Sequence, residues 1–305
     1  MANVLIFSEN NALAAELLTA GRMIGEVKAV CINNAEQAAA LSAAGAAVYT
    51  VQQEGLVMAD AGSVASILKQ AAEQLGAAVI LLSSNRRGKL IAGTSAQKLQ
   101  AGCLTGVNSL KLDGDKIVCQ RNVLGGAVVA DQTVISSTQV IAVAPKSFAQ
   151  AEAAGGGSIQ ALDVNGATAG LVFVSSQPKE GDSVDISAAD ILLVLGVGVD
   201  DQGMVAVAEE LAAQLGGAVA CTKPVATDRK WFDEERIVGI SGKTCKPSLA
   251  ILFGISGQVQ FYAGIRDAKV IASVNNDDNA LIAGMADYVL CADAQAVIPE
   301  LKSIL

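Results

Sequence analysis

A glycine-flanked serine in the last third of the chain carries the clearest chemical signal in the sequence. Residues 249–260, LAILFGISGQVQ, join an apolar, strand-like run to Gly-Ile-Ser-Gly and a polar helix start. A strand that ends in such a turn exposes several backbone N–H groups and one hydroxyl, which suits a pyrophosphate. The plainer alternative is that Ser256 caps the next helix between two turn glycines. The motif therefore predicts either an anion site or a simple helix start.

Two other glycine motifs are weaker candidates for phosphate binding. Residues 195–198, LGVG, follow an apolar run, but the next glycine is Gly203, so the GxGxxG spacing fails. A tight turn that needs residues without Cβ explains the same motif. In residues 237–243, IVGISGK, the P-loop pattern requires glycine at 238, where the chain has valine. A nucleoside triphosphatase and a nicotinamide-dependent enzyme are both disfavoured.

The composition excludes large classes of chemistry. The 305 residues include no histidine, so Ser-His-Asp and Cys-His nucleophile pairs and histidine-ligated zinc are impossible. A formal charge of −9 and an aromatic content of 3% disfavour binding to nucleic acid. An apolar content of 52% and a charged content of 17% are typical of a folded chain. We therefore expect no acid–base enzyme, no metal site and no nucleic-acid partner.

Cysteine usage and the length of the apolar runs bear on location. The six cysteines are dispersed and form no CxxC pair, as expected for reduced thiols in the cytoplasm. The first residues, MANVLIFSEN, lack the basic start and the long apolar stretch of a signal peptide. Glycine interrupts the longest apolar runs well before the ~20 residues that a membrane-spanning helix needs. The sequence predicts a cytoplasmic protein with no integral membrane segment.

Short apolar runs alternate with alanine-rich stretches of helical period, which predicts an α/β fold. In the first half we expect strands at 4–7, 27–32, 46–51 and 78–82, and helices at 13–23, 35–43 and 64–75. From 105 to 143 the period shifts toward two, with turn signals at Asp113-Gly114 and Gly125-Gly126. This shift predicts appended antiparallel strands. Residues 86–89, RRGK, are expected to form a solvated loop before a helix.

A polar stretch divides this pattern in two. Residues 175–190 are poor in apolar residues and contain several Gly, Ser, Pro and Asp, as a linker does. Beyond it we expect a helix over 204–215 ended by Gly216-Gly217, and strands at 191–195, 218–221, 249–253, 270–274 and 288–291. We predict two doubly wound α/β domains, a nucleotide-binding-like one over 1–186 and a parallel-sheet one over 187–305.

Four segments of the second domain are similar to a known family: CTKPVATDRKWFDEERIVGISGK (221–243), PSLAILFGISGQVQFYAG (247–264), IASVNNDDNALI (271–282) and ADYVLCAD (286–293). In order, spacing and length they resemble the FAD-binding domain of electron transfer flavoprotein alpha subunits, especially the FixB-like bacterial branch. The first domain agrees more loosely, through VLIFSEN (4–10), SNRRGKLIA (84–92) and LGGAVV (124–129).

The resemblance implies a subunit that carries electrons and catalyses no bond breaking of its own. It implies one FAD, bound mostly by the second domain, and a beta subunit as partner. It also implies electron exchange with an acyl-CoA dehydrogenase or reductase, or with a similar redox protein.

Several residues match positions that hold the cofactor in this family. Ser256 and the N–H groups after it match the pyrophosphate site, and Thr222 and Lys223 match the pair beside the isoalloxazine. Ser241 matches the hydroxyl at flavin N5, and Asn275 and Asp293 match the ribityl-to-adenosine end. The implied site comprises Thr222, Lys223, Val238, Gly239, Ile240, Ser241, Ser256, Gly257, Gln258, Val259, Gln260, Phe261, Asn275 and Asp293.

Some positions depart from the family pattern. Val197 stands where an arginine is usual, Ile240 where a glutamine is usual, and Phe261 where a histidine is usual. Lys223 replaces an arginine and lacks the planar fork that binds two acceptors at once. Residues 276–283, NDDNALIA, lack the usual proline. A flavin in this less cationic, more apolar pocket is expected to have a lower midpoint potential, or a weaker affinity, than in a typical member.

Several alternatives stay open at this point. The leading interpretation is the FAD-bound carrier, and the other is a structural or regulatory subunit that holds AMP or nothing at the same site. Trp231 and Phe232 either anchor a surface loop or contact a partner protein. Cys221, beside the implied flavin site, is either redox-active or a small buried apolar residue.

Overall fold

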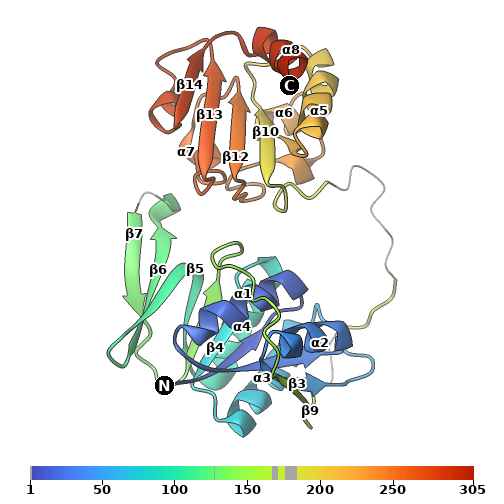
Figure 1. The fold of residues 1–305 in the computed structure, drawn as a ribbon, viewed down its shortest axis with the longest axis vertical. Helices are drawn as coiled ribbons and strands as arrows, with labels where there is room; N and C mark the ends of the chain where they lie inside the picture. The colour runs from blue at the N-terminus through green and yellow to red at the C-terminus, as the bar shows by residue number, and fades with distance from the viewer. Residues whose placement is uncertain (1, 127, 167–170, 176–183) are drawn as a thin grey trace. The chain divides into compact units, whose positions relative to one another are not determined.

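A computed structural model describes residues 2–126, 128–166, 171–175 and 184–305 (Figure 1). The chain divides into two compact units, Met1–Ser176 and Gln177–Leu305, and each is described by itself. The linker predicted over 175–190 lies partly outside the described residues. The boundary at residue 186 stays a prediction, and Ile186 itself is fully buried in a core of the second unit. Within the described ranges, no helix is both long and apolar enough to cross a bilayer.

The first unit is built on one large mixed sheet. Its strands lie in the order β7-β6-β5-β8-β4-β1-β2-β3-β9. Its elements in chain order are β1 (Ala2–Phe7), α1 (Asn11–Arg22), β2 (Gly25–Ile32), α2 (Ala35–Ala43), β3 (Ala47–Val51), α3 (Ala61–Leu75), β4 (Val79–Ser83), α4 (Arg86–Leu99), β5 (Gly102–Asp113), β6 (Lys116–Val123), the 3₁₀ helix η1 (Leu124–Gly126), β7 (Val128–Thr133), β8 (Gln139–Val143) and β9 (Ser158–Ala161).

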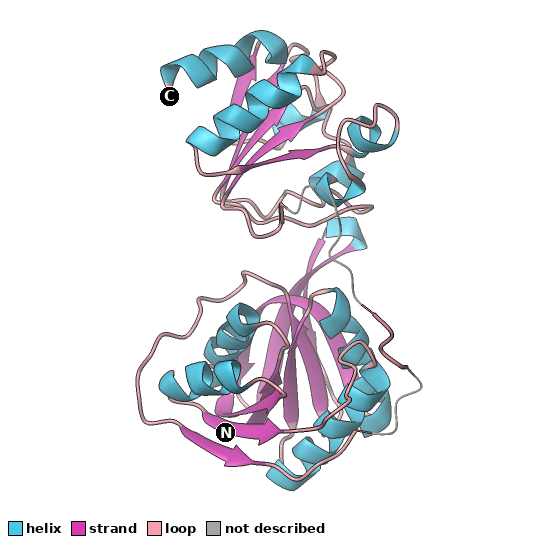
Figure 2. Ribbon diagram, turned by 90° about the vertical axis from the view of Figure 1, so that its right-hand side faces the viewer, coloured by secondary structure: helices cyan, strands magenta, loops and turns pink. Residues whose placement is uncertain are grey.

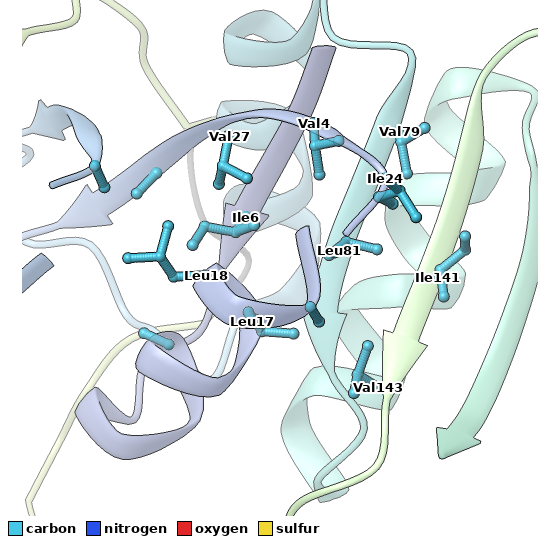
Figure 3. Close-up of a cluster of buried hydrophobic side chains, with 14 of the residues drawn as sticks. Val4, Ile6, Leu17, Leu18, Ile24, Val27, Val79, Leu81, Ile141 and Val143 are labelled. Carbon is cyan, nitrogen blue, oxygen red and sulfur yellow. The ribbon is translucent and has the colours of Figure 1, made fainter. Parts of the chain in front are cut away.

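The central strands of this sheet are buried on both faces, which explains why their sequences are continuously apolar rather than alternating. In β1, Val4 and Ile6 face one core, while Leu5 and Phe7 face the other. Figure 3 shows the first core, where Leu17 and Leu18 of α1 pack against residues from β1, β2, β4 and β8. Figure 2 shows the helices of this unit in two groups on opposite sides of the sheet.

The structure corrects two sequence predictions in this unit and adds one strand. Residue 86 begins α4, with Asn85 as its N-cap, so residues 86–89 form the first helical turn and not a loop. Strands β5, β6 and β7 are antiparallel as predicted, but β8 runs parallel to both β4 and β5. Strand β9 was not predicted, because it is only four residues long, all of them exposed, and follows a glycine-rich segment.

The second unit has a smaller, wholly parallel sheet in the order β11-β10-β12-β13-β14. Its elements are β10 (Ile191–Leu195), α5 (Gly203–Gln214), β11 (Ala218–Cys221), α6 (Lys223–Thr227), η2 (Glu234–Arg236), β12 (Leu249–Phe253), α7 (Val259–Tyr262), β13 (Val270–Asn275), η3 (Leu281–Gly284), β14 (Tyr288–Cys291) and α8 (Ala294–Ile304). Gly216, in the left-handed region with φ of 68°, follows α5 as predicted. The prediction of two α/β domains, the second with a parallel sheet, is confirmed.

Two cores flank this sheet as well. One face of β10, through Leu193 and Leu195, packs against α5 and α8. The other face, through Leu192 and Val194, packs against the loops and short helices that follow β11, β12 and β13. One side of the sheet is thus covered by two long helices, and the other is covered mainly by loops. Loops at the carboxyl ends of parallel strands are where open α/β sheets bind ligands.

Candidate functional site

A cavity of about 430 Å³ lies at the carboxyl ends of β10, β11 and β12. Strand β10 comes first in this sheet, and the chain then places β11 on one side of it and β12 on the other. This change of direction is the topological switch point, where loops diverge and leave a crevice for a ligand. The cavity is lined by Gly196, Val197, Thr222, Lys223, Pro224, Val238, Ile240, Ser241, Gly254, Ile255, Ser256, Gln258, Gln260 and Phe261.

Glycines allow the loops after β10 and β12 to lie against each other. The N–H of Gly198 donates to the carbonyl of Gly254 at 3.0 Å. A Cβ on Gly198 would lie 2.7 Å from the Cα of Gly254, and a Cβ on Gly196 would lie 2.3 Å from the Gly254 carbonyl oxygen. Gly254 also has φ of 62°, which side chains disfavour. These three positions therefore require glycine for backbone packing.

The loop after β12 presents a run of unused backbone donors. The N–H groups of residues 255–260 donate to no acceptor within the described part of the chain. Ser256, in the middle of the run, is exposed and lines the cavity. Successive free N–H groups in such a turn form a concave anion site. An anion that binds here would displace no described hydrogen bond of these N–H groups.

Ser256 is not the N-cap of the helix that follows. That position belongs to Gln258, whose side chain makes no capping bond, and α7 is only a single turn. The interpretation of Ser256 as a capping serine is therefore wrong. Any anion here would be held by the loop N–H groups and the serine hydroxyl, rather than by the dipole of a long helix.

Two polar side chains reach the cavity from the end of β11. The hydroxyl of Thr222 is buried and has no hydrogen-bond partner among the described residues. Its backbone N–H donates to the carbonyl of Leu195 at 3.0 Å, which fixes the residue beside β10. Lys223 is exposed, and no described carboxylate lies within ion-pair distance of it. A ligand in the cavity therefore finds one unsatisfied hydroxyl and one unpaired cation.

Lys243, the other lysine of this region, is occupied elsewhere. Its Nζ lies 3.2 Å from Asp185 and 3.3 Å from Glu235. It does not line the cavity, so the Gly-Lys-Thr tail of the P-loop-like motif contributes nothing to it. The motif instead ties the segment 239–243 back on itself, since the N–H of Gly239 donates to the carbonyl of Lys243 at 3.1 Å.

Comparison with family models shows to which protein family the chain belongs. Residues 4–167 match the model described as electron transfer flavoprotein domain, and residues 185–266 match the model described as electron transfer flavoprotein FAD-binding domain. The chain belongs to the electron transfer flavoprotein family. This confirms the predicted family, and the second match supports FAD as the cofactor of the second unit.

Similar relatives cover this flavoprotein chain almost from end to end. Protein FixB of Salmonella paratyphi A is 30% identical over 99% of this chain and 98% of its own length. Protein FixB of Escherichia coli O157:H7 is 28% identical over 99% of this chain and 97% of its own length. The likeness therefore includes both units.

The sequence placed most of the flavoprotein site where the cavity is. Thr222, Lys223, Val238, Ile240, Ser241, Ser256, Gln258, Gln260 and Phe261 line it. The predicted set of cofactor-binding residues did not include Gly196, Val197, Pro224, Gly254 and Ile255, which also line it, although Val197 was noted as a departure within the same pocket. The glycine motifs at 195–198 and 254–257 were the available signal for four of these five positions.

The remaining predicted residues do not line the cavity. Asn275 donates through Nδ2 to the carbonyl of Ile255 at 2.8 Å, so it holds the donor-rich loop rather than standing in the cavity. Asp293 is the N-cap of α8 and accepts from the N–H of Gln295 at 3.0 Å. Gly239, Gly257 and Val259 flank lining residues in the chain. Direct contact with the cofactor stays a prediction for all fourteen residues, those that line the cavity and these five alike.

The structure also bears on two features that the sequence left open. Cys221 is fully buried, and burial raises the pKa of its thiol to about 12, so it is an unreactive, apolar residue. Trp231 and Phe232 are half-buried and pack against the core of Cys221, Val225 and Ile237. Both aromatic rings thus anchor their own loop.

Three apolar residues of the cavity wall stand at positions where the sequence departs from the family. Val197 and Ile240 are 48% and 64% exposed, and Phe261 is buried. All three line the cavity. The cavity thus combines an apolar wall with the donor-rich loop and the Thr222 hydroxyl, which suits a ligand that has both a flat apolar ring and a charged diphosphate.

Proposed function

We propose that the chain is the FAD-binding alpha-type subunit of a cytoplasmic electron transfer flavoprotein. It acts as an electron carrier and not as a catalyst, pairs with a beta subunit, and exchanges electrons with an acyl-CoA dehydrogenase or reductase, or with a similar redox protein. The single observation that supports this most strongly is the run of free N–H groups at 255–260, set at the switch point of a domain that matches the family's FAD-binding model.

The residues present fit FAD in character. The loop N–H groups and the Ser256 hydroxyl would hold the diphosphate, which needs several donors and a compact turn. Thr222 would donate its unsatisfied hydroxyl, and Lys223 would place positive charge near the ring system. Bound FAD supplies the redox chemistry, because its ring takes up and releases electrons. The protein orients the ring, excludes water with Val197, Ile240 and Phe261, and sets the local charge.

The proposal predicts a specific glycine requirement. Gly257 has φ of 87°, and a Cβ there would lie 2.3 Å from the backbone nitrogen of Ile282. Gly257→Ala must therefore displace the loop that carries the free N–H groups. We expect its FAD dissociation constant, measured by fluorescence titration of the full chain with its partner, to rise at least about tenfold, as for the loss of one or two charge-assisted hydrogen bonds.

Gly284→Ala is the matched control, because a Cβ at Gly284 meets nothing within 4 Å. It should bind FAD like the unchanged protein. Equal FAD affinity in Gly257→Ala and Gly284→Ala would show that the diphosphate does not lie on this loop.

A visible spectrum separates the carrier from the alternative subunit that holds AMP or nothing. A yellow complex whose absorbance bleaches on reduction supports the carrier. A colourless complex that binds AMP and not FAD would favour the alternative. Co-purification with the product of the neighbouring open reading frame tests the proposed beta partner in the same preparation.

A further inference from the structure

Arg229 makes an unusual set of contacts just outside the cavity. In the chain it lies between α6 and η2. Its Nη2 donates to the carbonyl of Val197 at 2.8 Å, and its Nη1 donates to the carbonyl of Val199. One guanidinium thus spans two carbonyls of the loop that follows β10, in the forked geometry that arginine alone provides.

The loop that Arg229 binds is part of the cavity wall. Gly196 and Val197 line the cavity, and Val199 is fully buried in the core behind them. Backbone bonds also join the loop to β12 and the loop after it, from the Gly196 N–H to the Phe253 carbonyl at 2.8 Å and from the Gly198 N–H to the Gly254 carbonyl at 3.0 Å. Arg229 therefore supplies the side-chain restraint that complements these bonds.

The surrounding chain is arranged to hold the guanidinium in place. Its Cζ lies 4.7 Å from the centre of the Trp231 ring, in a cation–π contact. Lys230, between the two, has φ of 58°, a left-handed conformation that long side chains disfavour. This turn is maintained by the bond from the Trp231 N–H to the carbonyl of Val225 at 3.2 Å. A disfavoured backbone conformation persists where the surrounding contacts outweigh its cost.

The charge of Arg229 is not neutralised. Its two guanidinium hydrogen bonds go to neutral carbonyls, and no described carboxylate lies within ion-pair distance. Lys223, which lines the cavity, and Arg229, which binds the Val197 carbonyl behind its wall, are thus two cations with no ion-pair partner among the described residues. An unneutralised cation at a partly buried site favours an anionic ligand.

We propose that Arg229 is a positioning residue of the cofactor site: its guanidinium fixes the 196–199 loop in the conformation that lines the cavity and adds positive charge for an anionic dinucleotide. The proposal rests on the proposed function for the identity of the ligand. The role of Arg229 toward the 196–199 loop rests on its two hydrogen bonds to that loop alone. Val197 leaves this edge without a cationic side chain of its own, and Arg229 brings a guanidinium to the same backbone from a neighbouring loop.

The experiment compares Arg229→Gln and Arg229→Lys in the full-length chain with Arg266→Gln as control. Arg266 also stacks on an aromatic ring, that of Tyr262 at 5.9 Å, but its guanidinium bonds to no cavity loop among the described residues. Hydrogen exchange of the amides of Gly196, Gly198 and Val199 is measured without FAD. The FAD dissociation constant is then measured at low and high salt, together with the absorbance spectrum of the bound flavin.

Both Arg229 variants should exchange these three amides about tenfold faster, because neither keeps the two-carbonyl fork. Arg229→Gln should also raise the FAD dissociation constant about tenfold, flatten the salt dependence of this constant and shift the flavin absorbance. Arg229→Lys should recover part of the FAD affinity, because it keeps the positive charge. Protection of the β10 and β12 amides should stay unchanged and shows that the sheet is folded. Arg266→Gln should match the unchanged protein throughout.

Exchange of the Gly196, Gly198 and Val199 amides at the rate of the unchanged protein, in both variants or in Arg229→Lys alone, would overturn the positioning role. Normal FAD affinity and spectrum in Arg229→Gln would overturn the role toward the cofactor. If the unchanged protein binds no FAD, the proposed function fails, whereas the exchange measurement still decides the claim about the loop.

Discussion

The Thr222 hydroxyl is buried beside the cavity with no partner among the described residues. Leaving such a group unsatisfied costs about 1–3 kcal/mol. We therefore expect Thr222→Val to raise the free energy of unfolding of the FAD-free chain by about 1 kcal/mol. It should also weaken FAD binding, because the ligand loses its donor. Urea denaturation and FAD titration measure the two effects.

Ser273 provides a matched comparison for Thr222. Its hydroxyl is also buried without a described partner, but it lies within β13 and does not line the cavity. Ser273→Ala should leave FAD affinity unchanged. If Thr222→Val binds FAD as tightly as the unchanged protein, the hydroxyl serves no ligand.

Val197 places a neutral side chain in the cavity wall where the family usually has an arginine. Its side chain is 48% exposed and lines the cavity, so a longer residue fits there without displacing the core. Val197→Arg should raise the flavin midpoint potential by roughly 20–40 mV, because an added cation stabilises the anionic reduced flavin by about 1–2 kcal/mol. Potentiometric titration measures this shift, with Val197→Gln as the uncharged control of similar length. A potential at or below that of the unchanged protein would contradict the expectation of a charge-poor site.

At the scale of helices and strands, the sequence was most informative where elements are buried. The second sheet was located strand by strand, because each of its first four strands is a short apolar run next to a turn residue. The helix start at Arg86 was missed, since its first turn is charged and contains glycine. Asn85, whose side chain accepts from Gly88 at 2.7 Å, was the signal that could have revealed it.

The sequence could predict which residues form the candidate site, but not how these residues contact one another. Ser256 and Thr222 stand out by motif and resemblance. That Asn275 bonds to the Ile255 carbonyl, and that Gly198 lies against Gly254, depends on which strands become neighbours. Sheet order is set by packing across the whole unit, so local pattern gives no access to such contacts.

Helix α8 offers a test that separates capping from cofactor binding. Asp293 accepts from the N–H of Gln295 at the start of α8, and N-cap residues contribute about 0.5–2 kcal/mol. Asp293→Ala should therefore lower the free energy of unfolding of the second unit by about 1 kcal/mol, whereas Asp293→Asn should not. Asp60→Ala, which removes the N-cap of α3 in the first unit, is the control for FAD affinity. A loss of FAD affinity in Asp293→Ala alone would support the predicted adenosine contact.

At the scale of the whole molecule, the chain has separate hydrophobic cores in its two units. Separate cores unfold as separate cooperative units. Calorimetry of the full chain should therefore show two transitions. FAD at a hundred times its dissociation constant should stabilise only the second unit. It should raise the free energy of unfolding of that unit by about 2.7 kcal/mol and its transition temperature by about 10 °C. A single transition that shifts as a whole would contradict this.

The backbone contact between Gly198 and Gly254 couples the two loops that line the cavity. With no side chains between them, the loops after β10 and β12 cannot be displaced independently. A ligand group that moves Val197 must also move Ile255 and Ser256, and the reverse holds equally. For the proposed FAD, we therefore expect affinity at the ring end and affinity at the phosphate end to be linked, so that each half of the dinucleotide prepares the surface that receives the other.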